Sequence, residues 1–164
     1  MTNAARVTDD APQRQRLDAS GLASLVGYAA SLAAYRLRKS FTRHMGPLGL
    51  KIAEFSILML VARNPEVNQK QLGAELLISA PNMAVTLDRM VEQGWVERVR
   101  STADRRAQHI HLTPAGAQLA QRAGRIAATM EAPELSVLSP AEQALLIELL
   151  HKVCLLYTSP SPRD

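Results

Sequence analysis

The side chains with the most recognisable chemistry lie in one short polar segment. Residues 100–106 read Arg-Ser-Thr-Ala-Asp-Arg-Arg and place three cations beside one carboxylate: Arg100, Arg105, Arg106 and Asp104. Guanidinium groups bind phosphates and gain from the concentrated negative potential of a narrow A·T-rich groove. Asp104 can pair with Arg106 across a tight loop and hold that guanidinium at the tip. Two interpretations follow: a contact with nucleic acid, or a solvated turn whose ion pair contributes ~0–1 kcal/mol.

The remaining chemistry-bearing residues are too few for catalysis or metal binding. His109 and His111 alternate along one stretch, and His151 lies three residues before Cys154. Neither pair supplies the three or four protein ligands of a typical zinc site. The sequence also contains no P-loop, no Gly-x-Ser-x-Gly motif and no nucleophile with an adjacent histidine partner. We therefore expect no catalytic residue, no metal and no cofactor, and we do not expect an enzyme.

Length and composition are those of one compact globular domain, or of one small domain with a helical extension. The 164 residues are 47% hydrophobic and only 4% aromatic, and the formal net charge is +4. No apolar run approaches the ~20 residues of a membrane helix, and the N-terminus has no apolar signal region. The basic excess lies in residues 1–51, with eight Arg and Lys against three Asp. We expect a cytoplasmic, mainly helical protein whose partners do not include a membrane.

The elements that position these side chains can be predicted from apolar spacing and from helix-breaking residues. Four successive helices are expected at 20–45, 50–63, 68–77 and 79–93, separated by Gly46-Pro47, Asn64-Pro65 and a short turn. In the second helix, the residues expected to face inward are Ile52, Phe55, Leu58, Met59 and Ala62. Asn68 and Gln71 are spaced as a capping box for the third helix. Two short helices joined by a turn of two or three residues are typical of a helix-turn-helix.

After Gly94 the spacing of apolar residues changes from that of a helix to that of a strand. Short strands are expected around residues 95–99 and 109–112, so that the arginine-rich segment becomes the loop of a β-hairpin, or wing. Thr113-Pro114 then supplies an N-cap and a first-turn proline for a helix towards Met130. Ser139 and Glu142 form a capping box for a leucine-rich last helix.

The predicted fold class is therefore mainly α with a small β-hairpin wing. It is a winged helix-turn-helix with N- and C-terminal dimerisation helices. The expected divisions are a flexible arm (1–18), a helical dimerisation region (19–49 and 114–154), a winged helix-turn-helix DNA-binding domain (50–113) and a tail (155–164). The tail reads LLYTSPSPRD and resembles translated adaptor sequence; it is expected to be a non-native or ordinary disordered terminus without function.

Four motifs, in order, resemble those of the MarR family of winged-helix transcription regulators. They are Leu-Asp-Arg-Met at 87–90, Gly-Trp-Val-Glu-Arg at 94–98, Asp-Arg-Arg at 104–106 and Leu-Thr-Pro-Ala-Gly at 112–116. The resemblance covers about residues 20–153. It implies that Arg106 enters the minor groove of DNA and that Arg105 lies nearer the phosphates.

The recognition helix departs from many relatives, which carry a Thr-Arg pair where this chain has Ala84 and Val85. Its expected DNA face comprises Ser79, Pro81, Asn82, Ala84, Val85 and Arg89. Asn82 is expected to be the main hydrogen-bonding reader, because an amide can bond adenine through two atoms, with Ala84 or Val85 against a thymine methyl. Arg89 is expected to bind either Asp88 or a phosphate. At the start of the preceding helix, Gln69, Lys70 and Gln71 are expected to contact the DNA backbone.

The resemblance implies a ligand-responsive, homodimeric repressor that reads a pseudopalindromic operator in double-stranded DNA. Aromatic acids are the implied effectors, in a pocket whose candidate residues are Tyr35, His44, Met45, Phe55 and Met59. For Phe55 and Met59, plain core packing is an equal alternative. Two other hypotheses remain: a winged-helix protein–protein interaction module without DNA function, and a DNA-binding regulator without an effector. A steep salt dependence of DNA binding would favour a regulator.

Overall fold

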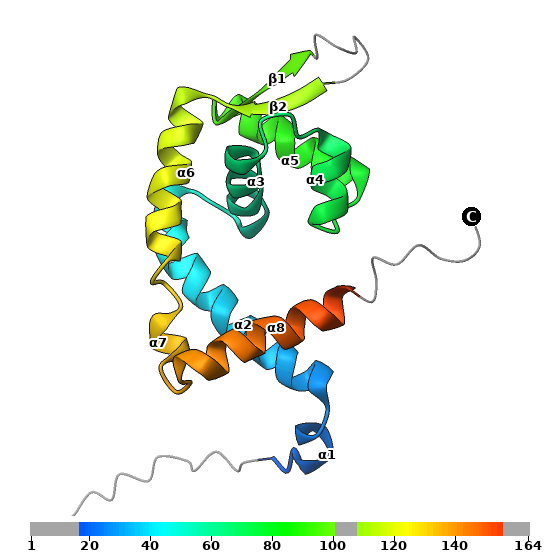
Figure 1. Cartoon of the computed structure of the whole chain (residues 1–164), viewed down its shortest axis with the longest axis vertical. Coiled ribbons are helices and arrows are strands. Elements are labelled where there is room, and N and C mark those ends of the chain that lie inside the picture. The colour runs from blue at the N-terminus through cyan, green and yellow to red at the C-terminus, as the bar shows by residue number, and fades with distance from the viewer. Residues whose placement is uncertain (1–16, 101–107, 156–164) are drawn as a thin grey trace, which may run out of the picture. The chain divides into compact units, whose positions relative to one another are not determined.

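The computed structural model describes residues 17–100 and 108–155 (Figure 1). The chain divides into two compact units, residues 1–34 and 35–164, with the boundary inside one long helix. In chain order the helical elements are α1 (Ser20–Ala23), α2 (Val26–Met45), the 3-10 turn η1 (Gly46–Leu48), α3 (Ile52–Arg63), α4 (Gln69–Glu75), α5 (Ala80–Glu92), α6 (Pro114–Ala127), α7 (Ala132–Leu135) and α8 (Pro140–Leu155). The strands are β1 (Val96–Arg100) and β2 (Gln108–Leu112). A mainly helical fold with a two-stranded wing is thereby confirmed.

The N-terminal unit contains α1 and the first turns of α2. Residues 17–34 include no buried side chain, and large apolar groups such as Leu22, Leu25 and Val26 are exposed. The prediction of one helix from residue 20 to residue 45 is wrong, because the helix is interrupted at Ser24–Leu25. Helices are stabilised mainly by packing of an amphipathic face, and no buried face supports a continuous helix here.

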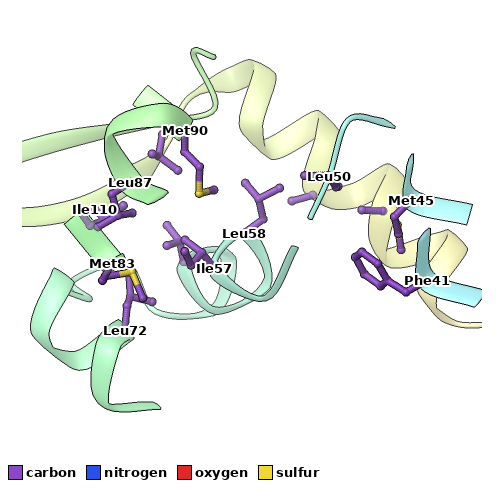
Figure 2. Packing of buried hydrophobic residues seen from close by; sticks show 14 of the residues in the cluster. Phe41, Met45, Leu50, Ile57, Leu58, Leu72, Met83, Leu87, Met90 and Ile110 are labelled. Carbon is purple, nitrogen blue, oxygen red and sulfur yellow. The ribbon is translucent and has the colours of Figure 1, made fainter. Parts of the chain in front are cut away.

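The core of the second unit surrounds α3 (Figure 2). Ile57 and Leu58 of α3 are fully buried, as is Leu72 of α4. The other buried apolar residues come from α3 (Val61), α5 (Met83, Leu87, Met90), β1 (Val96), β2 (Ile110), α6 (Ala120, Ala123), the segment after α6 (Met130) and the stretch around η1 (Phe41, Met45, Leu50). The buried positions of α5 recur every three or four residues, which leaves the opposite face of that helix free for a partner.

Two of the residues expected to face inward from α3 lie outside the core. Ile52 and Ala62 are exposed, whereas Ile57 and Val61 are buried, so the buried stripe is rotated from its expected position. Ile52 is the first residue of α3 and Ala62 lies in its last turn. Helix ends are covered by fewer neighbours than helix middles, so apolar residues there remain exposed more readily.

The wing is an antiparallel hairpin whose register pairs Val96 with Leu112 and Arg100 with Gln108. A third segment joins it, since Asn68 forms an isolated bridge with His109 and the amide of Ile110 donates to the carbonyl of Val67 at 2.9 Å. The chain entering α4 is thus hydrogen-bonded to β2. This pairing fixes the wing to the segment that leads into α4.

Helix boundaries follow the capping residues more closely than the apolar pattern. Reciprocal hydrogen bonds between Asn68 and Gln71 start α4, and Thr113 accepts from the amide of Gly116 at the start of α6. α4 ends at Glu75 rather than Leu77, and α6 ends at Ala127. No single helix in the described ranges is long and apolar enough to cross a membrane.

Candidate nucleic-acid interface

The start of α4 presents one unpaired basic side chain and two amides. Lys70 is exposed and forms no ion pair within residues 17–100 and 108–155. Gln71 is already engaged, because its Oε1 accepts from the Asn68 amide at 2.9 Å while Asn68 Oδ1 accepts from the Gln71 amide. Gln69 is half-buried. Of the three residues expected to contact the DNA backbone, Lys70 therefore has the geometry for a phosphate and Gln71 has a structural role.

The N-terminal half of α5 carries an exposed polar and apolar stripe. Pro81 and Asn82 are exposed in the first turn, and Val85 is 69% exposed one turn later. Ala84 is half-buried, so Val85 is the better placed of the two for a thymine methyl. Ser79 precedes the helix without a side-chain cap. No hydrogen bond engages the Asn82 amide in the described part of the chain, which leaves it available for a base edge.

The guanidinium of Arg89 is bound by a buried carboxylate, although the Arg89 side chain is 36% exposed. Its guanidinium is ion-paired with Glu54 of α3, whose side chain is 2% exposed. Asp88, the alternative partner considered from the sequence, instead pairs with Arg98 of β1 at 2.7 Å. The expectation that Arg89 binds Asp88 is therefore wrong, and a phosphate contact by Arg89 would compete with a buried carboxylate.

The wing places Arg100 at the end of β1, exposed and opposite Gln108. Asp104, Arg105 and Arg106 lie outside the described residues, so their expected roles stay predictions. His109 and His111 are half-buried on β2. Within the described ranges, no group of three His, Cys, Asp or Glu side chains lies close enough to hold a metal ion.

The five candidate effector residues are not gathered around one cavity. Tyr35 is 69% exposed, Met45 is fully buried, and Phe55 packs edge-on against Phe41 with ring centroids 5.6 Å apart. His44 alone lines a described pocket, an open hollow of 430 Å³. The other residues of that hollow are Arg122, Arg125, Ile126, Thr129 and Met130. Core packing is the role that this structure gives to Met45 and Phe55.

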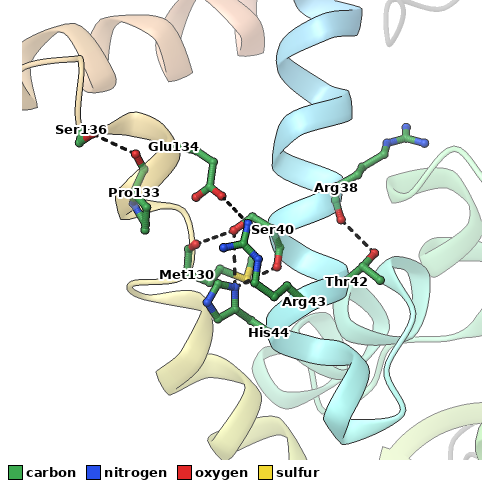
Figure 3. Close-up of polar contacts among 9 residues, drawn as sticks. All are labelled: Arg38, Ser40, Thr42, Arg43, His44, Met130, Pro133, Glu134 and Ser136. Carbon is green, nitrogen blue, oxygen red and sulfur yellow. Dashed lines mark hydrogen bonds and ion pairs between the residues drawn. The ribbon is translucent and has the colours of Figure 1, made fainter. Parts of the chain in front are cut away.

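His44 belongs to a polar cluster that joins α2 to the segment after α6 (Figure 3). Its Nδ1 lies 2.9 Å from the carbonyl oxygen of Ser40, and the hydroxyl of Ser40 donates to the carbonyl of Met130 at 2.7 Å. Arg43, which directly precedes His44 in α2, forms an ion pair with Glu134 of α7 at 3.2 Å. These contacts orient the His44 ring, which also lines the hollow.

Reasoning from the sequence missed one residue next to the interface. Glu54 is 1% exposed, accepts from the Lys51 amide at 2.7 Å and binds Arg89. A signal was present, since Glu54 is the only charged residue between Ile52 and Ala62, where the chain is otherwise apolar apart from Ser56. A lone acid within such a run requires a buried partner.

Comparison with known proteins agrees with this geometry. A sequence model of the MarR family matches residues 48–107. An uncharacterized HTH-type transcriptional regulator of Bacillus subtilis, YkoM, is 34% identical over 105 residues, which are 63% of this chain and 68% of YkoM. The chain belongs to the MarR family. This MarR-family chain is therefore a DNA-binding transcription regulator, and members of this family are regulators rather than enzymes.

Solved structures place the fold in the same family. The transcriptional repressor CouR bound to a 23-mer DNA duplex is 30% identical, with a TM-score of 0.80 over 85% of this chain and 99% of CouR. CouR bound to p-coumaroyl-CoA is 28% identical, with a TM-score of 0.76 over 85% of this chain and 98% of that one. The winged helix-turn-helix predicted from the sequence is confirmed by these likenesses.

Proposed function

We propose that this MarR-family regulator is a ligand-responsive homodimeric repressor that reads a pseudopalindromic operator. The observation that carries the proposal is the exposed stripe of Asn82 and Val85 on α5, beside a wing strand that ends in Arg100. Similarity to CouR, a repressor bound to DNA, supports the same conclusion. In this proposal Asn82 reads adenine, Val85 contacts a thymine methyl, and Lys70, Arg100 and Arg105 neutralise phosphates while Arg106 enters the minor groove.

The proposed dimer follows from apolar surface that one chain leaves in water. Along α8 the exposed side chains are Leu145, Leu146, Ile147, Leu149, Leu150 and Val153, between 40% and 56% exposed. A contiguous apolar face of this kind marks an interaction surface. A second copy related by a twofold axis would cover it, and the two α5 helices would then meet two half-sites in opposite orientation.

The proposed response to a ligand rests on similarity. CouR has been solved with p-coumaroyl-CoA, an aromatic acyl thioester, and it covers 85% of this chain. We extend to this chain an aromatic acid or its thioester as effector. Of the five candidate contacts, His44 is the one we retain, because it lines the 430 Å³ hollow, whereas Met45 and Phe55 pack in the core. The site of action that we propose is the cytoplasm.

Selection of DNA from a random duplex library by the purified protein tests the proposal. We expect enrichment of an inverted repeat, with log affinity falling steeply and linearly against log salt concentration. Scrambled duplexes of the same composition are the control, and they should bind at least ~1000-fold more weakly at moderate salt. Failure to enrich any sequence, with no salt-dependent binding, would instead favour the protein–protein interaction module.

A further inference from the structure

Glu54 is a buried acid, and each of its two carboxylate oxygens accepts a hydrogen bond. One carboxylate oxygen accepts from the Lys51 amide at 2.7 Å, at the start of α3, and the other binds the guanidinium of Arg89 in the last turn of α5. A carboxylate that is 1% exposed requires such partners, because desolvation of an unpaired charge is costly. The pair therefore joins α3 to α5, and within residues 17–100 and 108–155 no other hydrogen bond or ion pair connects these two helices.

Arg89 and Asn82 share one side of α5. They are seven residues apart, and seven residues of an α-helix return to within ~20° of the starting direction. The rotation of α5 about its axis therefore turns both side chains together. The apolar residues Met83, Leu87 and Met90 bury the helix, but dispersion contacts are individually weak and non-directional. An ion pair with directed hydrogen bonds fixes the rotation more sharply.

The neighbouring residue strengthens this constraint. Asp88 pairs with Arg98 of β1 at 2.7 Å, so adjacent residues of α5 are bound to α3 on one side and to the wing on the other. The Arg89 side chain is 36% exposed, and its Nε atom is buried without a partner in the described part of the chain. A free phosphate-binding arginine would extend its guanidinium into solvent, whereas this one is turned towards Glu54.

We propose that Glu54 is a positioning residue for DNA recognition. It acts through Arg89 to set the rotation of α5 about its axis, and this rotation determines the direction in which the Asn82 side chain points. The inference rests on the proposed DNA-binding function. It gives Arg89 a role in positioning α5 together with Glu54, in place of a contact with a DNA phosphate. Neither side chain needs to touch DNA. Loss of either partner should reduce discrimination between sequences more than it reduces general attraction to DNA.

The test uses the full chain with five variants: Glu54→Gln, Arg89→Gln, the double variant, Arg89→Lys, and Glu92→Gln as a control. Glu92→Gln makes the same isosteric change at an exposed residue of α5 that has no ion pair in the described ranges. Each variant is measured for melting temperature, for affinity to the duplex that the wild-type protein enriches, and for affinity to a scrambled duplex, at several salt concentrations.

We expect Glu54→Gln and Arg89→Gln each to weaken binding to the selected duplex by about tenfold or more, and binding to the scrambled duplex by less than about threefold. The salt slope should stay unchanged, because no phosphate contact is lost. The double variant should show the same loss as either single variant, since both remove the same constraint. Arg89→Lys should keep part of the discrimination, and Glu92→Gln should behave as the wild type.

Stability separates positioning from simple support of the fold. Arg89→Gln leaves a buried carboxylate uncompensated and should lower the melting temperature more than Glu54→Gln does. The double variant removes both charges and should recover much of that loss. Under our inference its affinity for the selected duplex stays low despite the recovered stability. Recovery of wild-type affinity together with stability would overturn the inference and leave the pair a purely structural role.

Two further results would also overturn it. Wild-type discrimination in Glu54→Gln would show that α5 needs no such constraint. Equal weakening of both duplexes by Arg89→Gln, with a salt slope reduced by about one unit, would make Arg89 a phosphate contact. Failure of the proposed function is distinct from these outcomes, because the wild-type protein would then enrich no duplex at all.

Discussion

Gly116 lies so close to the backbone of Trp95 that a β-carbon on residue 116 would stand 1.8 Å from the Trp95 carbonyl oxygen. The same junction is closed by Thr113, whose hydroxyl donates to the carbonyl of Gly94 at 2.6 Å and accepts from the Gly116 amide at 3.0 Å. The first turn of α6 therefore sits directly on the turn between α5 and β1. This contact gives a physical reason for a glycine at the end of the Leu-Thr-Pro-Ala-Gly motif.

Gly116→Ala should destabilise the protein, because the added methyl group meets backbone atoms that can move only with α6 or the wing. Overpacking of this kind costs about 1–3 kcal/mol in the free energy of unfolding. Gly124→Ala is the matched control on the same helix, where the new β-carbon would meet only the Met59 sulfur at 3.9 Å. That variant should gain up to ~1 kcal/mol from helix propensity. Urea denaturation measures the free energy of unfolding of both variants. Equal changes in that free energy would contradict the close contact between Gly116 and the backbone of Trp95.

Leu77 adopts a left-handed backbone conformation in the turn between α4 and α5, with φ of 52°. Its side chain is 82% exposed, so it gains little from burial. A left-handed L-residue costs roughly 1–2 kcal/mol, and asparagine adopts this conformation more readily. Leu77→Asn should therefore raise the free energy of unfolding by about 0.5–1 kcal/mol, measured by urea denaturation. Leu77→Val provides the opposite control, and it should destabilise because a β-branched residue is strained at this φ.

The sequence was sufficient to predict the elements that carry local signals. The Asn68–Gln71 and Ser139–Glu142 capping boxes were both found as expected, and so was the Thr113 cap. Each of these motifs depends on residues within four positions of one another. The order of helices and the hairpin followed from such signals together with apolar spacing.

Features that depend on distant residues could not be predicted in this way. The Glu54–Arg89 pair joins residues 35 positions apart, and the Asn68–His109 bridge joins residues 41 positions apart. Periodicity also placed Ile52 inside, although its position at the start of α3 leaves it 44% exposed. Within the candidate site, exposure selects Asn82, Val85 and Lys70 from a longer set, and that selection required the packed structure.

Replacement of Asn82 and of Lys70 separates reading of bases from attraction to phosphates. Asn82→Ala should cost roughly 1–3 kcal/mol on the selected duplex and much less on scrambled DNA, because the amide is expected to bond a base edge. Lys70→Ala should weaken both and reduce the salt slope by about one unit. Fluorescence anisotropy at several salt concentrations measures all four affinities. Equal losses for Asn82→Ala on both duplexes would assign base reading to another residue, with Val85 the next to test.

The capping box of α8 makes a prediction about acid titration. Hydrogen bonds from the Ser139 amide and hydroxyl lower the pKa of Glu142 below its ordinary value. Because the pKa is lowered in the folded state, the contact stabilises α8 above the ordinary carboxyl pKa, and this contribution is lost as pH falls through the lowered value. Ser139→Ala should raise the pKa of Glu142, measured by NMR titration of the side-chain carboxyl carbon. The pKa of Asp18, lowered by Ser20 in the same manner, should not respond.

The apolar face of α8 should control the oligomeric state. The wild-type chain is expected to sediment at about 36 kDa, twice its 17.9 kDa mass. Leu149→Glu combined with Val153→Glu places two charges on a stripe one helical turn apart, so burial against a second copy would become unfavourable. No side chain between Pro140 and Cys154 is fully buried, so the variant should keep its circular dichroism spectrum while sedimenting as a monomer.

A matched control on the same helix is Glu148→Ala, which removes an exposed ion pair with Lys152 and should leave the dimer intact. The monomeric variant should bind the selected inverted repeat far more weakly than the wild type, since it loses the added effect of two linked half-site contacts. A dimer that persists in the Leu149→Glu, Val153→Glu variant at micromolar concentration would mean that α8 is not the surface through which two copies associate.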